Sequence, residues 1–260
     1  MIISVTSPVH GQAGNTTAAL LISLLLAKEH NKSVCLTHLS PQSSAFYTYL
    51  GLDGLEDKTC APSQVVKLLR EGAIEPRDMA DYCLRVCDNL DIFSNNSKSF
   101  SGDDMELTQR FILENMPHDF IVLDVDINTN EPLTKLARSK TDLNIVCLTQ
   151  SLNVTQRYAD VFTEKSAKKQ AKNTLLLCNH YSPDVGSVGA FAKGIGAKAK
   201  DCRTLHHSAM LMKMANAGRM SEIIPLAKSL PLPDLEADFK KLAFTVMQYY
   251  KKQITGVKKQ

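Results

Sequence analysis

The sequence carries little net charge and no long hydrophobic run. Its 260 residues include 30 Lys and Arg against 27 Asp and Glu, which leaves a formal net charge of +3. The whole-chain charge therefore favours neither nucleic acid nor membrane as a partner. The longest stretch dominated by apolar residues, Ala18–Ala27, is too short to span a bilayer. The opening Met1–Ser4 has neither a basic leader nor a long apolar segment after it, so we expect no signal peptide and a cytoplasmic protein.

The seven cysteines do not suggest a set of disulfides, because their number is odd. Cys35, Cys147 and Cys178 lie within apolar runs, as expected of reduced thiols buried in a cytoplasmic protein. Cys83 and Cys87 are four residues apart and would share one face of a helix, where they could bind a metal ion. No further Cys or His lies near them in the sequence, and we therefore expect no metal there.

Short apolar runs alternate with helix-like segments along most of the chain. This alternation predicts an α/β fold with a mostly parallel, twisted sheet and helices on both faces. The expected strands are 2–6, 33–39, 90–93, 120–124, 144–149, 174–178 and 201–205, and the expected helices include 16–28, 63–70 and 104–115. No internal repeat or linker is evident, and the polar segment 94–104 is expected to be a surface loop.

The first expected strand leads into a loop of the anion-binding type. Residues 7–17 read Ser-Pro-Val-His-Gly-Gln-Ala-Gly-Asn-Thr-Thr and are followed at once by the first expected helix. At such a junction backbone N–H groups and the helix dipole favour a phosphate, and Gly11 and Gly14 let the backbone approach closely. A plain connection between a strand and a helix has the same outline, so the loop alone does not decide between the two.

The loop resembles the deviant Walker A motif of the MinD/ParA family of P-loop ATPases, which reads Lys-Gly-Gly-x-Gly-Lys-Thr-Thr. The matching residues are Gly11, Gly14, Thr16 and Thr17. His10 stands at the signature lysine, Gln12 at the second glycine and Asn15 at the principal phosphate-binding lysine. Each lysine would make charge-assisted contacts worth about 1.5–3 kcal/mol, whereas backbone donors survive any side-chain change.

The exit of the second expected strand is similar to the family's switch I segment, in which a strand ends in Asp-x-Asp-Pro-Gln. Pro41 and Gln42 match, whereas His38 and Ser40 replace the two aspartates. In the family the second aspartate helps to orient the attacking water, and serine cannot supply that negative acceptor. The resemblance therefore implies slow hydrolysis.

Two later strands extend the resemblance. Phe120–Asp124 is similar to a Walker B strand, which would carry Asp124 to the C-terminal edge of a parallel sheet, with Asp126 assisting or facing a loop. The strand 175–179 is similar to the one whose terminal asparagine reads adenine, and Asn179 has the required donor and acceptor. Asn179 would serve equally well as a turn residue at the strand end.

The resemblance implies ATP and magnesium as ligands if nucleotide binds. The implied nucleotide-binding residues are His10, Gly11, Gln12, Ala13, Gly14, Asn15, Thr16, Thr17 and Asn179. Thr16 and Asp124 are the implied magnesium ligands, and no catalytic residue is assigned.

The segments 205–208 and 215–218 are similar to the family's last strand and the helix after it. Gly218 is expected to cap that helix. His206 and His207 are adjacent, so on a strand they would point to opposite faces, and we expect no metal between them.

The last part of the chain, 239–260, is set apart from the domain 1–238 by its charge. No acidic residue follows Asp238, while apolar residues recur at helical spacing among lysines, which indicates a basic amphipathic helix. Such a helix binds anionic membrane in MinD-like proteins, and ParA-like relatives bind DNA through surface lysines, so membrane or DNA is an expected partner. A last helix packed on the core would give the same pattern, and the uncharged run 242–247 favours it.

Taken over residues 2–222, the resemblance implies a positioning or partition protein. It would be a homodimer, cytoplasmic or peripheral at membrane or nucleoid, with a protein partner in a partition, pilus or secretion system. It would act as a weak or inactive ATPase and a nucleotide-dependent scaffold, like the atypical ATPases that localise Tad-type pili. The alternatives are an active ATPase with compensating residues, such as a synthetase or a nitrogenase iron-protein relative, and an interaction protein without ligand.

Overall fold

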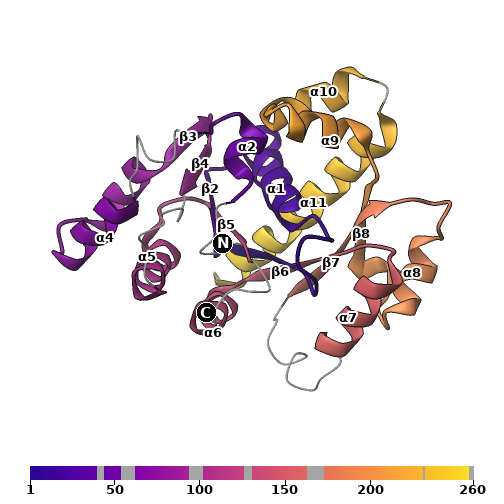
Figure 1. Ribbon diagram of the computed structural model, residues 1–260, viewed down its shortest axis with the longest axis horizontal. Coiled ribbons are helices and arrows are strands. Elements are labelled where there is room, and N and C mark those ends of the chain that lie inside the picture. The colour runs from indigo at the N-terminus through magenta and orange to yellow at the C-terminus, as the bar shows by residue number, and fades with distance from the viewer. Residues whose placement is uncertain are drawn as a thin grey trace.

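An eight-stranded sheet runs through the centre of the molecule (Figure 1). The computed structural model describes residues 1–39, 44–53, 62–93, 102–125, 131–162, 173–230 and 232–257. The strands are β1 Ile2–Thr6, β2 Val34–His38, β3 Leu84–Cys87, β4 Leu90–Phe93, β5 Phe120–Asp124, β6 Leu143–Leu148, β7 Thr174–Tyr181 and β8 Cys202–His206. Their order is β3-β4-β2-β5-β1-β6-β7-β8, and only β3 pairs antiparallel with its neighbour. The expected mostly parallel sheet is confirmed.

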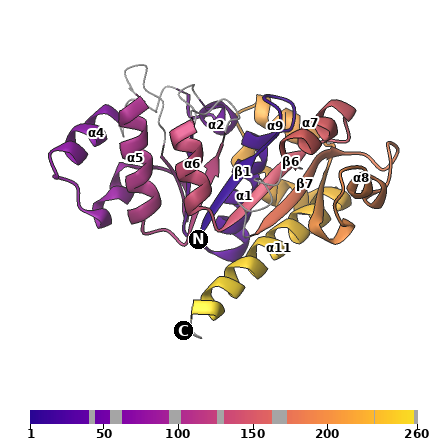
Figure 2. The same cartoon turned by 90° about the horizontal axis from the view of Figure 1, so that it is seen from below.

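Helices cover both faces of the sheet, as the apolar strands require. They are α1 Asn15–His30, α2 Phe46–Leu50, α4 Pro62–Arg70, α5 Gly102–Asn115, α6 Glu131–Lys140, α7 Leu152–Phe162, α8 Val188–Gly194, α9 Ala209–Asn216, α10 Ile223–Ser229 and α11 Pro233–Val257. On one face of the sheet, a single apolar core joins the strands to α1, α2, α9, α10 and α11. The other face is covered by α4, α5 and α6 and, beyond β1, by α7 and α8 (Figure 2).

Helix α1, which follows the loop after β1, is deeply buried between the sheet and other helices. Its residues 18–27 are all buried, because the sheet lies on one side and α10 and α11 lie on the other. A helix that is apolar on every side is stable only in such a place. The helix therefore holds the loop at its N-terminus on a rigid support.

The C-terminal helix α11 packs on the core. The core that α11 shares with α1 and α10 contains four of its buried residues, Leu235, Phe239, Leu242 and Val246. Near its end, Tyr250 donates a hydrogen bond of 3.0 Å to Asp119 at the start of β5. The helix runs without a break across residues 238 and 239, and its apolar face is already used inside the fold.

Two expectations about the cysteines had different outcomes. Cys35, Cys147 and Cys178 are buried, and burial raises the pKa of the Cys178 thiol to about 12, which suits unreactive core thiols. The expectation that Cys83 and Cys87 share a helical turn was wrong. Cys83 follows a 3-10 helix, Pro76–Tyr82, and Cys87 ends the edge strand β3.

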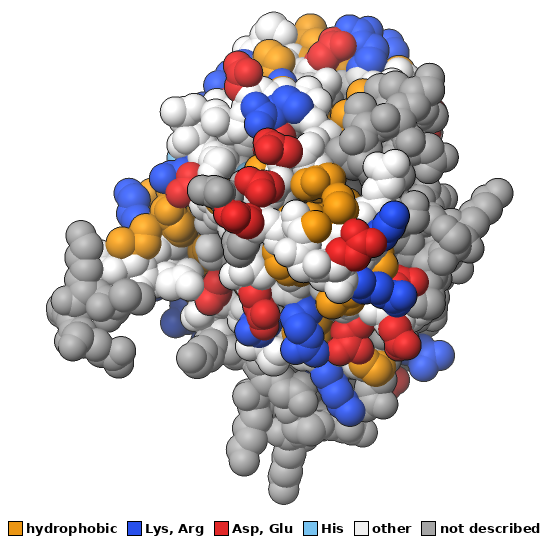
Figure 3. All heavy atoms as spheres, turned by 90° about the vertical axis from the view of Figure 1, so that its left-hand side faces the viewer, with side chains coloured by type: hydrophobic (Ala, Val, Ile, Leu, Met, Phe, Trp, Pro, Cys, Tyr) orange, Lys and Arg blue, Asp and Glu red, His pale blue; other side chains and the backbone are white. Residues whose placement is uncertain are grey.

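The surface carries charges of both signs. On the α4 side of the molecule, acidic and basic side chains are interspersed (Figure 3). Among the described helices, none combines the length and the hydropathy that a membrane-spanning segment needs. The loop expected at 94–104 falls largely outside the described residues, apart from the first residues of α5.

Candidate functional site

The loop between β1 and α1 opens at the C-terminal edge of the sheet. β1 lies between β5 and β6, so the loop leaves from the middle of that edge. Gly11 and Gly14 both have φ +69°, a conformation that favours glycine, and the N–H of Ala18 donates to the Gly14 carbonyl to begin the helix. Gly14 is the N-cap and offers no side chain to the first N–H groups of α1. Those groups, together with the helix dipole, form a site suited to an anion.

Thr16 and Asp124 meet directly beneath the loop. The Thr16 hydroxyl donates a hydrogen bond of 2.7 Å to Asp124 Oδ2. Asp124 ends β5 beside Val5 of β1, so adjacent parallel strands bring the carboxylate to the start of α1. A hydroxyl and a carboxylate are oxygen ligands of the kind that magnesium prefers, so the donor set fits the expected ion.

Asn179 is buried behind the loop at the end of β7. Its amide nitrogen donates to the Ala13 carbonyl and, at 3.4 Å, to the Gly14 carbonyl. Its side chain is 3 % exposed. In this structure Asn179 therefore supports the loop from β7, and a contact with an adenine base stays a prediction.

The outer part of the loop faces solvent. His10, Gly11 and Gln12 are exposed, whereas Ala13 is buried. Asn153 at the start of α7 donates a hydrogen bond of 3.2 Å to Gln12 Oε1, which ties the loop to the neighbouring helix. Asn15, half-buried at the first position of α1, has a buried Oδ1 that accepts no hydrogen bond from the described residues.

One histidine lies beside the inner part of the loop, and a second lies next to the first. A Cβ built on Gly14 would lie 3.6 Å from His180 Nε2. The ring of His207 lies beside that of His180, with 5.8 Å between the ring centroids. His206, in contrast, pairs through Nδ1 with Asp238 of α11 at 2.7 Å. The expected divergence of His206 and His207 is what the structure shows, and His180 is a neighbour of the loop that the sequence reasoning missed.

The segment expected to act as switch I is described only in part. His38 ends β2, is buried, and lies opposite Asp124 in the parallel register. Gln109 of α5 donates a hydrogen bond of 3.0 Å to the His38 carbonyl. Ser40, Pro41, Gln42 and Asp126 lie outside the described residues.

The fold can be compared with solved structures, although no family model and no curated protein matches the chain. A chain of the MinC:MinD cell division protein complex from Aquifex aeolicus is 16% identical, with 95% of each chain covered and a TM-score of 0.70. The chain has the MinD/ParA fold. The septum site-determining protein MinD complexed with Mg-ADP from Pyrococcus horikoshii OT3 is 17% identical, with 94% of this chain and 95% of that chain covered and a TM-score of 0.65. A plasmid partition protein from Borrelia burgdorferi B31 bound to AMPPNP is 17% identical, with 97% and 98% covered and a TM-score of 0.66.

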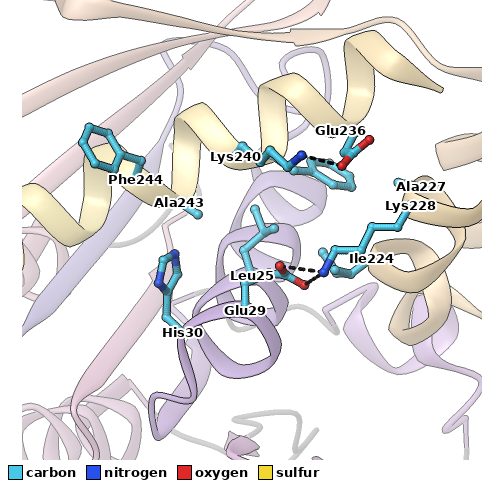
Figure 4. Close-up of a pocket in the computed structure, with 11 residues that line it drawn as sticks. Leu25, Glu29, His30, Ile224, Ala227, Lys228, Glu236, Lys240, Ala243 and Phe244 are labelled. Carbon is cyan, nitrogen blue, oxygen red and sulfur yellow. Dashed lines mark hydrogen bonds and ion pairs between the residues drawn. The ribbon is translucent and has the colours of Figure 1, made fainter.

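Within this MinD/ParA fold a separate hollow of about 240 Å³ lies at the far end of α1 from the loop (Figure 4). Its apolar floor includes Leu25, Phe239 and Ala243. Lys228 donates to both carboxylate oxygens of Glu29 at 2.8 Å, so charges at its rim are paired. None of the residues expected to bind nucleotide lines it.

Proposed function

We propose that the chain is a MinD/ParA-like positioning or partition protein that binds ATP and magnesium on the loop 10–17 and turns ATP over slowly or not at all. The observation that carries the proposal is the contact of Thr16 with Asp124 beneath a loop whose N–H groups open the helix α1. The Mg-ADP and AMPPNP complexes of proteins with this fold support nucleotide as the ligand class.

In the proposed site, backbone groups bind the phosphates, and side chains bind the magnesium ion and the base. Backbone N–H groups of the loop and of the first turn of α1 would hold the phosphates. Thr16 and Asp124 would hold the magnesium ion, and Asn179 would contact the base or keep the loop in place. When bound, the ion supplies positive charge that neutralises the phosphate oxygens.

By the resemblance, three residues of the proposed site differ from those that accelerate hydrolysis in the family. His10 and Asn15 stand where two permanent positive charges would be, and Ser40 stands where a carboxylate would orient water. Developing charge on the phosphates is then poorly compensated. The proposed protein therefore uses nucleotide to assemble a scaffold rather than to drive rapid turnover.

Steady-state phosphate release at saturating ATP is expected to be barely above the background without protein. The reason is the joint loss at His10, Asn15 and Ser40. The control is Asp124→Ala, which removes the expected magnesium ligand and reports any contaminating activity. Turnover comparable to that of an ordinary family member, abolished by Asp124→Ala, would contradict the proposed slow site.

We further propose a homodimer whose interface includes the loop around His10. By the resemblance, His10 occupies the position from which a lysine reaches the partner's nucleotide, and His10 is exposed. An imidazole has an unperturbed pKa of about 6.5 and is charged only when protonated, and a nearby phosphate favours the charged form. Dimerisation with ATP and magnesium should therefore strengthen as the pH falls from about 8 to about 6.

The dimer proposal is tested by sedimentation of wild type and His10→Lys at both pH values. Lysine stays charged throughout this range, so His10→Lys should tighten the dimer and remove its pH dependence. Gln12→Lys adds the same charge two positions along the exposed loop and serves as the matched control. Identical behaviour of wild type and His10→Lys would place His10 away from the nucleotide.

The partners of the proposed scaffold are a second copy and a protein of a partition, pilus or secretion system. The apolar face of α11 is packed on the core, so insertion of that face into a bilayer would require the helix to leave the fold. The exposed Lys241, Lys251 and Lys252 remain available to an anionic surface, whether membrane or nucleoid, and we propose a cytoplasmic protein that is peripheral there. The second candidate is an interaction protein without ligand, which the loss of both loop lysines favours.

A further inference from the structure

We propose that the surface around Phe244 of α11 binds an acidic amphipathic helix of a protein partner. The Phe244 surface consists of two hollows that share this side chain, one between α1, α10 and α11 and the other between α8, β8 and α11. Neither hollow is lined by a residue expected to bind nucleotide. The inference rests on the proposed function only in that the scaffold has a protein partner.

Phe244 projects from α11 into solvent. It is 61 % exposed, and it is the one aromatic residue among the large apolar side chains that are exposed in the described part of the chain. Its neighbours on the helix, Leu242 and Val246, are buried in the core instead. The fold therefore gains little from the Phe244 ring, whereas an exposed aromatic beside a hollow is typical of residues that anchor a partner.

The first hollow has room for apolar side chains of a partner. Its floor includes Leu25 of α1, Ile224 of α10 and Ala243 of α11, which are buried and therefore held in place by the core (Figure 4). The volume is about 240 Å³. Sites for whole drug-sized ligands usually measure about 300–1,000 Å³. The first hollow is thus of a size for one or two inserted side chains.

The charges around the first hollow are paired with one another. Glu29 lies 2.8 Å from Lys228, and Glu236 lies 2.6 Å from Lys240. The other titratable residue that lines this hollow is His30, near the end of α1. Apolar contacts therefore decide what enters the first hollow, because its exposed ion pairs contribute little.

The second hollow, of about 380 Å³, is positively charged. Lys241 and Arg203 line it, and no Asp or Glu does. Arg203 donates to the neutral oxygens of the Thr245 hydroxyl and the Lys200 carbonyl. Among the described residues, neither cation forms an ion pair, although Asp201 is exposed just before β8. Carboxylates on a partner would therefore be attracted to this side of Phe244.

The outline of the surface favours a helix as the occupant. The two hollows meet at Phe244 and together follow α11, so an elongated segment with apolar side chains three and four residues apart would fit them. Strand addition is blocked, although β8 is an edge strand. At the two ends of its outer edge, Asp238 accepts from the His206 N–H and Arg203 donates to the Cys202 carbonyl.

A bilayer or a nucleic acid would use only part of this surface. Phosphate groups would contact Lys241 and Arg203, but they would leave the apolar floor of the first hollow in water. An acidic amphipathic helix uses the cations and the apolar floor together. The observations therefore favour a protein segment over the two other anionic partners.

The test begins with selection of peptides on the whole chain, without nucleotide, from a displayed library of random sequences of about 16 residues, about four helical turns. Recovered peptides are synthesised, and their dissociation constants are measured by fluorescence anisotropy. Phe244→Ser removes the exposed ring, and Lys241→Glu reverses a charge of the second hollow. Met212→Ser and Lys213→Glu are the matched controls, because both residues are exposed on α9 and line neither hollow.

We expect the recovered peptides to carry Asp or Glu beside apolar residues spaced three and four apart. Phe244→Ser should weaken their binding by about tenfold or more. Lys241→Glu should also weaken it, by a factor that shrinks as salt is added. Met212→Ser and Lys213→Glu should bind the peptides as wild type does.

Recovery of no peptide, or of peptides that bind Phe244→Ser as tightly as wild type, would overturn the inference. Binding of phosphatidylglycerol vesicles or duplex DNA that Lys241→Glu abolishes and Phe244→Ser leaves unchanged, with no peptide that depends on Phe244, would assign the surface to a membrane or nucleic acid instead. Self-association that Phe244→Ser abolishes would assign it to a second copy. Peptide binding that depends on Phe244 in a protein that fails to bind ATP would support the inference while contradicting the proposed nucleotide site.

Discussion

Replacing Gly218 with alanine is expected to lower the free energy of unfolding by about 2–4 kcal/mol. Gly218 follows α9 with φ +67°, as expected of a helix-capping glycine, and its backbone touches that of Gly51 at the end of α2. A Cβ on Gly218 would lie 2.8 Å from Gly51 Cα and 2.9 Å from Gly51 N. Both contacts are with backbone, so the two helix ends must move apart. The cost combines a strained φ, about 1 kcal/mol, with overpacking of about 1–3 kcal/mol.

The matched control is Gly72→Ala. Gly72 has φ +65°, but a Cβ there would meet no atom within 4 Å. Gly72→Ala should therefore lower the free energy of unfolding only by the cost of the strained φ, about 1 kcal/mol. Urea denaturation of wild type and both variants measures the difference. Equal losses in Gly218→Ala and Gly72→Ala would show that the backbone contact between α2 and α9 contributes nothing.

The second large effect is expected from Asn15→Lys, which should raise the affinity for ATP by about 10- to 150-fold. Asn15 is the first residue of α1, between the N-cap Gly14 and Thr16. A lysine there adds a charged donor to the phosphates, worth about 1.5–3 kcal/mol, which corresponds to that range of dissociation constants. The asparagine oxygen it replaces is buried and accepts no hydrogen bond from the described residues, so nothing described is lost with it.

Gln12→Lys separates a specific contact from general attraction. It adds the same charge on the exposed part of the loop, where electrostatic attraction alone should give a smaller and more salt-sensitive gain. Titration of ATP into both variants at low and moderate salt makes the comparison. An equal gain from both would mean that Asn15 does not face the phosphates.

The fold could be predicted from the sequence because its strands are short apolar runs in a fixed order. Phe120–Asp124 and Leu143–Leu148 are buried on both faces, and α1 is apolar on every side, so local composition reflects their place in the core. The meeting of Thr16 and Asp124 followed from the same order, since parallel strands end at one edge. Both the fold and this contact follow from the alternation of apolar strands and helices along the sequence.

What the sequence did not reveal depends on contacts between distant segments. Leu84–Cys87 is a half-exposed edge strand, and its pattern carries no strong period. Asn179 turns its amide to the loop carbonyls, and His180 adopts a positive φ, because β7 meets β8 irregularly there. The place of α11 on the core was one of two outcomes that its pattern allowed, and only the packing of Phe239 and Val246 distinguishes them.

Nucleotide binding at Thr16 and Asp124 is tested by a calorimetric titration of ATP, with and without magnesium, into wild type, Thr16→Val and Asp124→Asn. We expect one site per chain, with tighter ATP binding when magnesium is present. Both variants should lose this effect of magnesium, because Thr16 and Asp124 together would hold the ion. Phe244→Ser, an exposed substitution on α11 far along the chain from the loop, should bind as wild type does. Magnesium-independent binding of equal strength in wild type, Thr16→Val and Asp124→Asn would contradict a magnesium site at these two residues. The absence of binding at millimolar ATP would contradict a nucleotide site on the loop.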